Sequence, residues 1–391
     1  MMTLIRNAHI VTATQTFCGS MLTRNGIIID LGEGAGAVIG TGIRAAQVGN
    51  VPVEDWGGDY LLPGLVELHT DNLEKHLMPR PKVNWPTLPA IMAHDAQIAS
   101  AGITTVLDAI SVGDIDSDSM RNDTLYACTQ GLRHAANAGI LRADHFLHMR
   151  LELAEEHLLD MFSPYLHDDR LRLVSLMDHT PGQRQWTDLA HYRTYVSGKR
   201  GWSEDKVEYM LERLLVRQQT YAASNRQSVV ASCRSLARPV PLATHDDTTV
   251  AHVTEGVDDG VSISEFPTTL AAAHAAREQR LGIIMGAPNM VRGGSHSGNV
   301  SAAQLARADL LDVLSSDYVP ASLLHAAFLL QEQGFSLPKA IATVSRNPAQ
   351  MVGLQDRGEI ATGLRADFVR VRLSQGIPVV LGVWKEGQRI A

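Results

Sequence analysis

The sequence predicts an α/β protein: a (β/α)8 TIM-type barrel with a small β-rich domain built from both chain ends. Eight short, mostly apolar segments in the middle of the chain alternate with helical stretches, as they do in a barrel of strand–helix units. Both chain ends consist instead of short strand-like runs. An open doubly wound sheet would also alternate, but no G-x-G-x-x-G turn follows an early strand, so the barrel is favoured.

The small β-rich domain is expected from residues 1–57 and 358–391. In both stretches, short strand-like runs are separated by turn residues. Because the two ends share this texture, we expect them to come together in one sheet. The runs are Leu4-Ile5, His9–Thr12 and Ile27–Ile29 near the start, and Asp367–Leu373 and Val379–Trp384 near the end.

The barrel is expected over residues 58–357. Most of its strand candidates are followed by a helical stretch, of which Asp205–Ser224 is the clearest, because its apolar residues recur with helical periodicity. The strand candidates are Leu65–His69, Thr104–Asp108, His145–Glu152, Leu171–His179, Val240–His245, Val261–Pro267, Gly282–Ala287 and Asp312–Asp317.

The composition excludes several classes of protein. Of the 391 residues, 45% are hydrophobic and 19% charged, which is ordinary for a globular chain. The formal net charge of −8 argues against nucleic-acid binding through a general basic surface. No run reaches the roughly 18 apolar residues of a membrane span, and the N-terminus lacks the pattern of a signal peptide. With Cys18, Cys128 and Cys233 far apart, we expect buried, reduced thiols in a soluble cytoplasmic protein.

Polar residues lie where the candidate strands end, and in a barrel these ends meet on one catalytic face. Residues two apart on a strand share a face, so the first two of these residues can approach the same ion. A single histidine in such a place is more often simply hydrogen-bonded, and a single carboxylate often caps a helix. Six such residues on five strands favour a metal site. They are His69, Asp71, Glu152, His179, His245 and Asp317.

These residue types predict the chemistry of a metal-dependent hydrolase. Imidazole and carboxylate ligands suit Zn²⁺, with Mn²⁺ or Fe²⁺ as alternatives, and one or two ions are compatible with the set. Glu152 could bridge two ions, and Asp317 could take a proton from the attacking water. Asp178, Asp246 and Asp247 lie beside the chosen histidines and compete for the same roles.

Two segments and one arginine suit an anionic substrate. Lys75, His76, Arg80 and Lys82 follow the first strand closely, and Arg292, Ser295 and His296 lie in a glycine-rich segment after the seventh. Such a segment late in a barrel can bind phosphate through its backbone and cations, although it can also be a plain surface loop. Arg184 belongs to the long aromatic stretch Thr180–Trp202, which is either a lid or an interface.

Several motifs together resemble the PhnM family of the amidohydrolase superfamily. The resemblance runs from about residue 58 to the C-terminus; HTDN and RGGSHSGN are specific to the family, whereas GITTV is common across the superfamily. The motifs are LLPGLVELHTDN (61–72), GITTVLD (102–108), VSLMDHTPGQRQ (174–185), THDD (244–247), EFPTT (265–269), GAPNMVRGGSHSGN (286–299) and SSDY (315–318).

The resemblance implies a function in the carbon–phosphorus lyase pathway of phosphonate catabolism. It implies hydrolysis of α-D-ribose 1-methylphosphonate 5-triphosphate to the 5-phosphate and diphosphate, so the expected partner is a small phosphorylated sugar, with neither nucleic acid nor membrane. It also implies that the five residues from His69 to His245 named above bind metal and that Asp317 is the base. Asp71 stands where the superfamily usually has a second histidine, so the number of ions stays open.

Two alternatives remain at this stage. The first is hydrolysis of a cyclic amide or N-acyl bond on the same scaffold. The second is a non-catalytic metal-binding scaffold for another enzyme. The sequence also leaves open whether the chain works as a homodimer.

Overall fold

The computed structural model describes residues 2–34, 51–80, 83–114, 121–184, 203–295 and 298–391, together with Leu189, Arg193 and Ser197. Eight parallel strands follow one another in chain order around a barrel. The last strand returns to the first through a parallel bridge between Thr70 and Asp317 and a backbone hydrogen bond from Asp317 to His69. The strands are β6 (Leu65–Thr70), β7 (Ile103–Val112), β8 (Asp144–Glu152), β9 (Leu171–Met177), β10 (Leu242–His245), β11 (Ile263–Glu265), β12 (Gly282–Gly286) and β13 (Val313–Ser315).

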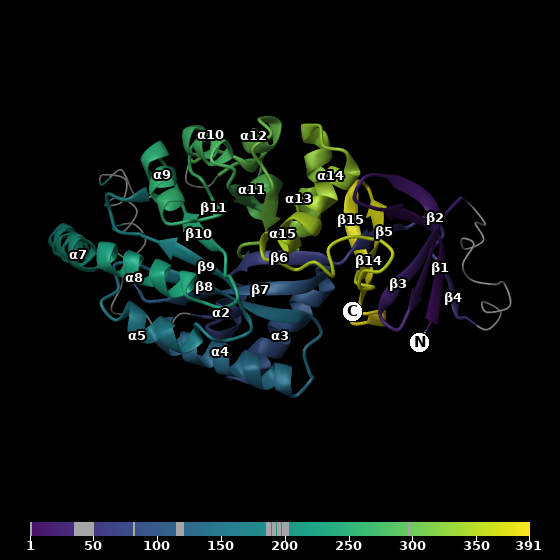
Figure 1. Cartoon of the computed structure of the whole chain (residues 1–391), viewed down its shortest axis with the longest axis horizontal. Coiled ribbons are helices and arrows are strands. Elements are labelled where there is room, and N and C mark those ends of the chain that lie inside the picture. The colour runs from purple at the N-terminus through teal and green to yellow at the C-terminus, as the bar shows by residue number, and fades with distance from the viewer. Residues whose placement is uncertain are drawn as a thin grey trace.

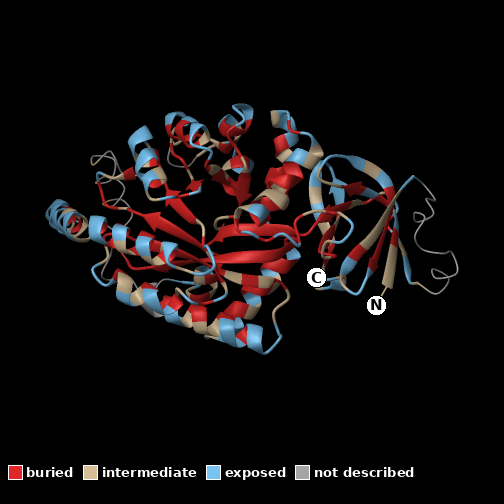
Figure 2. Ribbon diagram, in the orientation of Figure 1, coloured by how far each residue is buried: buried red, intermediate tan, exposed pale blue. Residues whose placement is uncertain are grey.

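The barrel interior is filled by apolar side chains from nearly every strand, and all ten residues of β7 are buried. In Figure 2 the strands are accordingly almost wholly red, whereas the helices around them are exposed on their outer sides. This packed core fixes the positions from which the strand ends project. Among its residues are Val66, Leu68, Leu107, Leu173, Ala243, Ile263, Ile284 and Val313.

Helices cover the outside of the barrel (Figure 1). Several begin at a hydroxyl side chain that accepts a backbone N–H of the first turn, as Thr249, Thr269 and Ser301 do. The helices are α2 (Asn72–Leu77), α3 (Thr87–Ser100), α4 (Arg121–Asn137), α5 (Leu158–Phe162), α7 (Glu204–Arg217), α8 (Ala223–Arg234), α9 (Val250–Asp258), α10 (Leu270–Glu278), α11 (Ala287–Arg292), α12 (Ala302–Arg307), α13 (Ser322–Leu329), α14 (Leu337–Ala342) and α15 (Arg346–Met351).

A second sheet combines strands from both chain ends and lies beside the barrel (Figure 1). Its order is β16-β15-β14-β5-β1-β2-β3, with β4 paired to β1. The two ends join at β5, which pairs with β1 on one side and β14 on the other. The strands are β1 (Met2–Val11), β2 (Thr16–Arg24), β3 (Ile27–Glu33), β4 (Val53–Asp55), β5 (Tyr60–Pro63), β14 (Phe368–Ser374), β15 (Ile377–Lys385) and β16 (Gln388–Arg389).

Aromatic packing and one buried carboxylate hold this terminal sheet together. Trp384 stacks on Phe368 with ring centroids 5.0 Å apart, and Trp56 packs against both rings. Asp59, next to β5, accepts hydrogen bonds from Arg370 (2.6 Å) and Arg372 (2.7 Å) of β14. The N-terminal and C-terminal segments are therefore joined by packing and charge as well as by strand pairing.

The predicted barrel and terminal sheet are confirmed, with shifts at the element ends. The helix expected over 205–224 is present, but it continues through a π-helical turn (Gln218–Ala222) into α8. The strand β2 was not predicted. The expectation of three buried thiols is wrong for one of them: Cys18 is exposed because β2 turns it to the solvent side of the sheet, whereas Cys128 and Cys233 are buried. Within the described residues, no helix has the length and apolarity required to cross a bilayer.

Candidate active site

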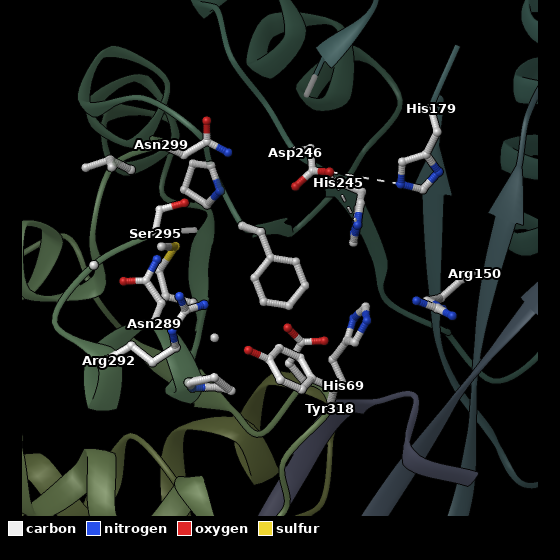
Figure 3. A pocket seen from close by; sticks show the side chains of 18 residues that line it. His69, Arg150, His179, His245, Asp246, Asn289, Arg292, Ser295, Asn299 and Tyr318 are labelled. Atoms are coloured by element: carbon white, nitrogen blue, oxygen red, sulfur yellow. Dashed lines mark ion pairs between the residues drawn. The ribbon is translucent and has the colours of Figure 1, made fainter. Parts of the chain in front are cut away.

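A cavity of about 220 Å³ opens at the carboxyl ends of the barrel strands. Two groups of side chains face each other across it (Figure 3). One group comes from the strand ends, and the other comes from the segment that follows β12. The first group includes His69, Arg150, His179, His245 and Asp246; the second includes Asn289, Arg292, Ser295 and Asn299.

Three histidines of the cavity are oriented in the same way by buried carboxylates. Nδ1 of His69 lies 3.0 Å from Oε1 of Glu265, and Nδ1 of His245 lies 3.3 Å from Oε2 of the same residue. Nδ1 of His179 lies 2.8 Å from Oε2 of Glu152. A carboxylate only accepts, so each Nδ1 carries the hydrogen, and in the neutral imidazole Nε2 keeps its lone pair. This is the arrangement in which carboxylates orient metal-binding histidines.

Asp246 completes a set of converging donors. Its Oδ2 lies 3.7 Å from Nε2 of His245 and 4.0 Å from Nε2 of His179, the two ion pairs drawn in Figure 3. The three ligand atoms all lie within 4.8 Å of one another. Burial disfavours protonation of His245, but the carboxylates of Asp246 and Glu265 outweigh it and raise its pKa. Two imidazoles and a carboxylate at these separations form a donor set that a divalent cation fits.

A second set of converging donors, His69, His148 and Glu265, is buried next to the first. Burial lowers the pKa of His148 to about 3, so this ring is neutral. Burial alone would raise the pKa of Glu265, but the contacts of its two oxygens with His69 and His245 hold it well below its usual range. The hydroxyl of Ser175 lies 2.5 Å from Oε2 of Glu265 and 2.6 Å from Nε2 of His148, and so links them.

Asp317 lies at the end of β13 and lines the cavity near His69. Burial raises the pKa of its carboxyl group; the carboxylate of Asp71 adds to this rise, whereas the His69 ring and the Arg150 guanidinium oppose it. A carboxyl group with a raised pKa is a stronger base than an ordinary exposed one. Its backbone is in the left-handed region, with φ of 52°, as is that of Asp246 (55°). Such backbone costs about 1–2 kcal/mol per residue and often marks functional sites.

Asp71 is close to this centre without being part of either set. It precedes α2, and its backbone N–H donates to the carbonyl of Asp317 at 3.2 Å. Its Oδ1 is buried and accepts no hydrogen bond, and the nearest cation, Nζ of Lys75, is 3.6 Å away. A buried carboxylate oxygen without a hydrogen bond needs a partner, and a divalent cation would supply one. The donor chemistry of the cavity therefore fits a divalent metal.

Comparison with known proteins identifies the group to which this chain belongs. A model described as "Amidohydrolase family" matches residues 190–390, more than half of the chain. The α-D-ribose 1-methylphosphonate 5-triphosphate diphosphatase of Escherichia coli (strain K12) is 43% identical over 390 residues, which are 99% of this chain and 100% of that protein. The chain belongs to the PhnM family of the amidohydrolase superfamily.

Solved amidohydrolase structures share the fold of this PhnM homologue at low identity. Dihydropyrimidinase from Brevibacillus agri matches with a TM-score of 0.62 and 13% identity, covering 100% of this chain and 95% of that one. N-acetylglucosamine-6-phosphate deacetylase from Pasteurella multocida matches with a TM-score of 0.60 and 12% identity, covering 100% and 99%. At such identities the likeness concerns the barrel and its accompanying sheet alone.

Six residues were predicted as metal ligands or as the base, and the structure brings four of them to the cavity of this PhnM-family protein: His69, His179, His245 and Asp317. Glu152 does not line it. Its two carboxylate oxygens instead accept from the backbone N–H (3.2 Å) and Nδ1 (2.8 Å) of His179, which is an orienting contact. Asp71 also does not line the cavity.

The residues predicted to bind the substrate are distributed more widely. Arg292 and Ser295 line the cavity, whereas Lys82 and His296 lie outside the described residues. Nζ of Lys75 donates to the carbonyl of Tyr318, a cavity residue, at 3.0 Å. His76 contacts Gln97 through Nε2 (2.9 Å), and Arg80 is exposed.

Arg184 is 4% exposed and does not line the cavity. Its Nη1 donates to Asp247 and to the carbonyl of His245 (3.1 Å), which ties it to the end of β10. Most of Thr180–Trp202 after Arg184, including its aromatic residues Trp186, Tyr192, Tyr195 and Trp202, lies outside the described residues, so its role as a lid or an interface stays a prediction.

Glu265 and Arg150 were not among the predicted site residues, and Asp246 was predicted only as a competitor for the metal roles. Glu265 ends the sixth strand, so the rule of polar strand ends could have found it. Arg150 was harder to find because it lies inside a strand, two residues before Glu152. In the structure it lines the cavity beside the histidines (Figure 3).

Proposed function

We propose that this chain hydrolyses α-D-ribose 1-methylphosphonate 5-triphosphate to the 5-phosphate and diphosphate, with a divalent metal, preferably Zn²⁺, as cofactor. One observation carries the proposal: a single cavity combines converging metal donors with an arginine-bearing segment on the opposite side. The 43% identity to the Escherichia coli diphosphatase over nearly the whole chain supports the same substrate.

His179, His245 and Asp246 would hold the metal, with His69 and Asp71 as the further donors beside them. Glu265 and Glu152 keep the Nε2 lone pairs of the three histidines available. A divalent cation held there would stabilise negative charge on phosphoryl oxygens and favour ionisation of water. The donor set of imidazoles and carboxylates suits Zn²⁺, although Mn²⁺ and Fe²⁺ accept the same ligands.

Asp317 would act as the base. Its carboxylate accepts a proton from water while the water oxygen forms a bond to the α-phosphorus. The bond from that phosphorus to the bridging oxygen breaks, and its electron pair leaves with the diphosphate. Burial of the Asp317 side chain raises the pKa of its carboxyl group, which strengthens it for this role.

The segment after β12 would bind the leaving diphosphate. Arg292, Ser295 and Asn289 present a guanidinium, a hydroxyl and an amide to the cavity from the side opposite the histidines (Figure 3). Charge neutralisation and positioning account for most of the catalysis of phosphoryl transfer, because the reaction needs little covalent chemistry from the protein. The cavity therefore offers separate places for the reacting phosphoryl group and for the leaving group.

The test is a substrate panel with metal-loaded protein. Release of diphosphate from the ribosyl triphosphate, without cleavage of cyclic amides or N-acyl sugars, supports the proposal. Amide cleavage without diphosphate release contradicts it, and inactivity toward both classes would leave only a metal-binding scaffold. In the same assay, Asp317→Asn should reduce kcat by about 10²–10⁴-fold while it binds as much metal as the wild type. Full activity of that variant would contradict the assignment of the base.

A further inference from the structure

An arginine with incomplete partners lies beside the metal donors. Arg150 belongs to β8, where His148, Arg150 and Glu152 alternate along the same side of the strand. Its side chain is only 13% exposed, and it lines the cavity together with His69 and His179 (Figure 3). A fixed positive charge is thus held inside the barrel mouth, next to the place where the reaction is proposed to occur.

The guanidinium of Arg150 has unused hydrogen-bonding capacity. A guanidinium offers five N–H donors. Nη2 of Arg150 donates to Oγ of Ser111 at 2.7 Å, but Nε is buried and has no hydrogen-bond partner. The carboxylate closest to it, that of Glu74, is 3.7 Å away, beyond hydrogen-bonding distance. Burying a cation without complete hydrogen-bond partners is unfavourable, and an anion entering the cavity would supply the missing acceptors.

Two other shielded arginines of the barrel bind carboxylates directly. Nη1 of Arg357 donates to the carboxylate of Asp144 at 2.6 Å, and Nη2 of Arg217 donates to that of Glu155 at 2.9 Å. Both have a structural explanation, because each joins two segments of the chain through a direct ion pair. Arg150 has only a longer ion pair, with Glu74 at 3.7 Å and without a hydrogen bond, and it also faces the cavity.

Resting on the proposed function, we propose that Arg150 donates hydrogen bonds to the non-bridging oxygens of the α-phosphoryl group under attack. During the step described above, negative charge on these oxygens is met by the guanidinium. Arg292 and Ser295 lie across the cavity and take the leaving diphosphate, so the two cations serve different phosphates. A planar guanidinium matches two phosphoryl oxygens, whereas an amide carbonyl offers only one, so Arg150 selects a phosphoanhydride over an amide.

The test compares Arg150→Gln and Arg150→Lys with the matched control Arg172→Gln. Arg172 lies on the neighbouring strand β9, donates to the carbonyl of Asp169 and does not line the cavity. We expect Arg150→Gln to lower kcat by about 10²–10³, the typical loss on removing one donor to developing charge. Arg150→Lys should recover part of this loss, and Arg172→Gln should stay near wild type.

Binding provides a readout that is independent of turnover. By calorimetry, ribose 5-phosphate should bind Arg150→Gln at least tenfold more weakly than wild type, with metal content unchanged. In Arg150→Ala, added guanidinium chloride at low millimolar concentration should restore part of kcat saturably, which loss of a merely structural contact would not allow.

The outcomes separate the two proposals. A wild-type protein that releases no diphosphate contradicts the proposed function, whatever Arg150 does. An active wild type with near-normal kcat and ribose 5-phosphate binding in Arg150→Gln contradicts the role of Arg150 alone. Loss of metal from Arg150→Gln, but not from Arg172→Gln, would show that Arg150 supports the metal donors, and would also overturn this inference.

Discussion

Replacing Glu265 with glutamine tests whether this carboxylate orients the metal-binding histidines. Glu265 is fully buried, and its two oxygens contact Nδ1 of His69 (3.0 Å) and of His245 (3.3 Å). Glutamine keeps the shape but has only one accepting oxygen. The amide NH2 of the glutamine would therefore face the Nδ1–H of one of the two imidazoles, and two donors cannot form a hydrogen bond. That imidazole could restore the bond only by moving its hydrogen from Nδ1 to Nε2. Either result weakens one donor that should face the metal.

The expected size of the effect follows from these contacts. Removing a partner that orients a metal-binding histidine typically costs 10–100-fold in metal affinity, which corresponds to about 1.4–2.7 kcal/mol. The fold should also lose stability, because a hydrogen bond to a buried charged group contributes about 1.5–3 kcal/mol. We therefore expect both a weaker metal site and a lower free energy of unfolding in Glu265→Gln.

The assay is competition for Zn²⁺ with a chromophoric chelator, combined with chemical denaturation of the metal-free protein. Asp168→Asn is the control, because Asp168 is also a shielded carboxylate, paired with Arg133 (2.9 Å) and Arg170 (2.7 Å), but away from the cavity. It should lose stability and keep wild-type metal affinity. Unchanged metal affinity in Glu265→Gln would refute the reasoning, and a loss above about 10⁴-fold would show that Glu265 is itself a ligand.

Three further outcomes are expected. Burial alone would lower the pKa of His145, but the carboxylates of Asp108 and Asp95 raise it from its usual 6.5 to about 9. The folded protein therefore holds a proton that the unfolded chain releases, and the free energy of unfolding should fall by up to about 3 kcal/mol as the pH rises from 6.5 through 9. Chemical denaturation of His145→Gln over the same pH range should show a smaller fall. Removal of metal by a chelator should lower Tm. Adding Zn²⁺ back at about a hundred times its Kd should raise the free energy of unfolding by about 2.7 kcal/mol, as followed in a thermal-shift titration. Gly256→Ala should cost about 1–3 kcal/mol by urea denaturation, because its Cβ would lie 2.5 Å from Cγ2 of Thr244; wild-type stability would contradict this packing.

The sequence predicted the barrel well because its strands are short apolar runs bounded by polar residues. Their ends were less certain: β7 extends to Val112, four residues beyond the prediction, because these residues are buried on both faces and show no period of two. The strand β2 was missed because its buried run, Gly19–Thr23, includes glycine and serine, and its cross-strand partners are supplied only by the folded sheet.

The candidate site was predictable where residue type and strand end coincided, as at His69, His179 and His245. The sequence could not show that Glu152 faces an imidazole nitrogen rather than the cavity, because that depends on side-chain direction. Nor could it show the hydrogen-bonding deficit of Arg150, since this depends on Ser111 and Glu74 of other segments. Both are properties of tertiary contacts.

The most direct measurement is ³¹P NMR of the ribosyl triphosphate reaction in H₂¹⁸O, with metal-depleted and metal-restored protein. The metal-restored protein should give the 5-phosphate and diphosphate in equal amounts, with ¹⁸O on the 5-phosphate, because water attacks the α-phosphorus. The metal-depleted protein should give neither product. Release of orthophosphate, or equal turnover without metal, would contradict a metal-dependent diphosphatase at this cavity.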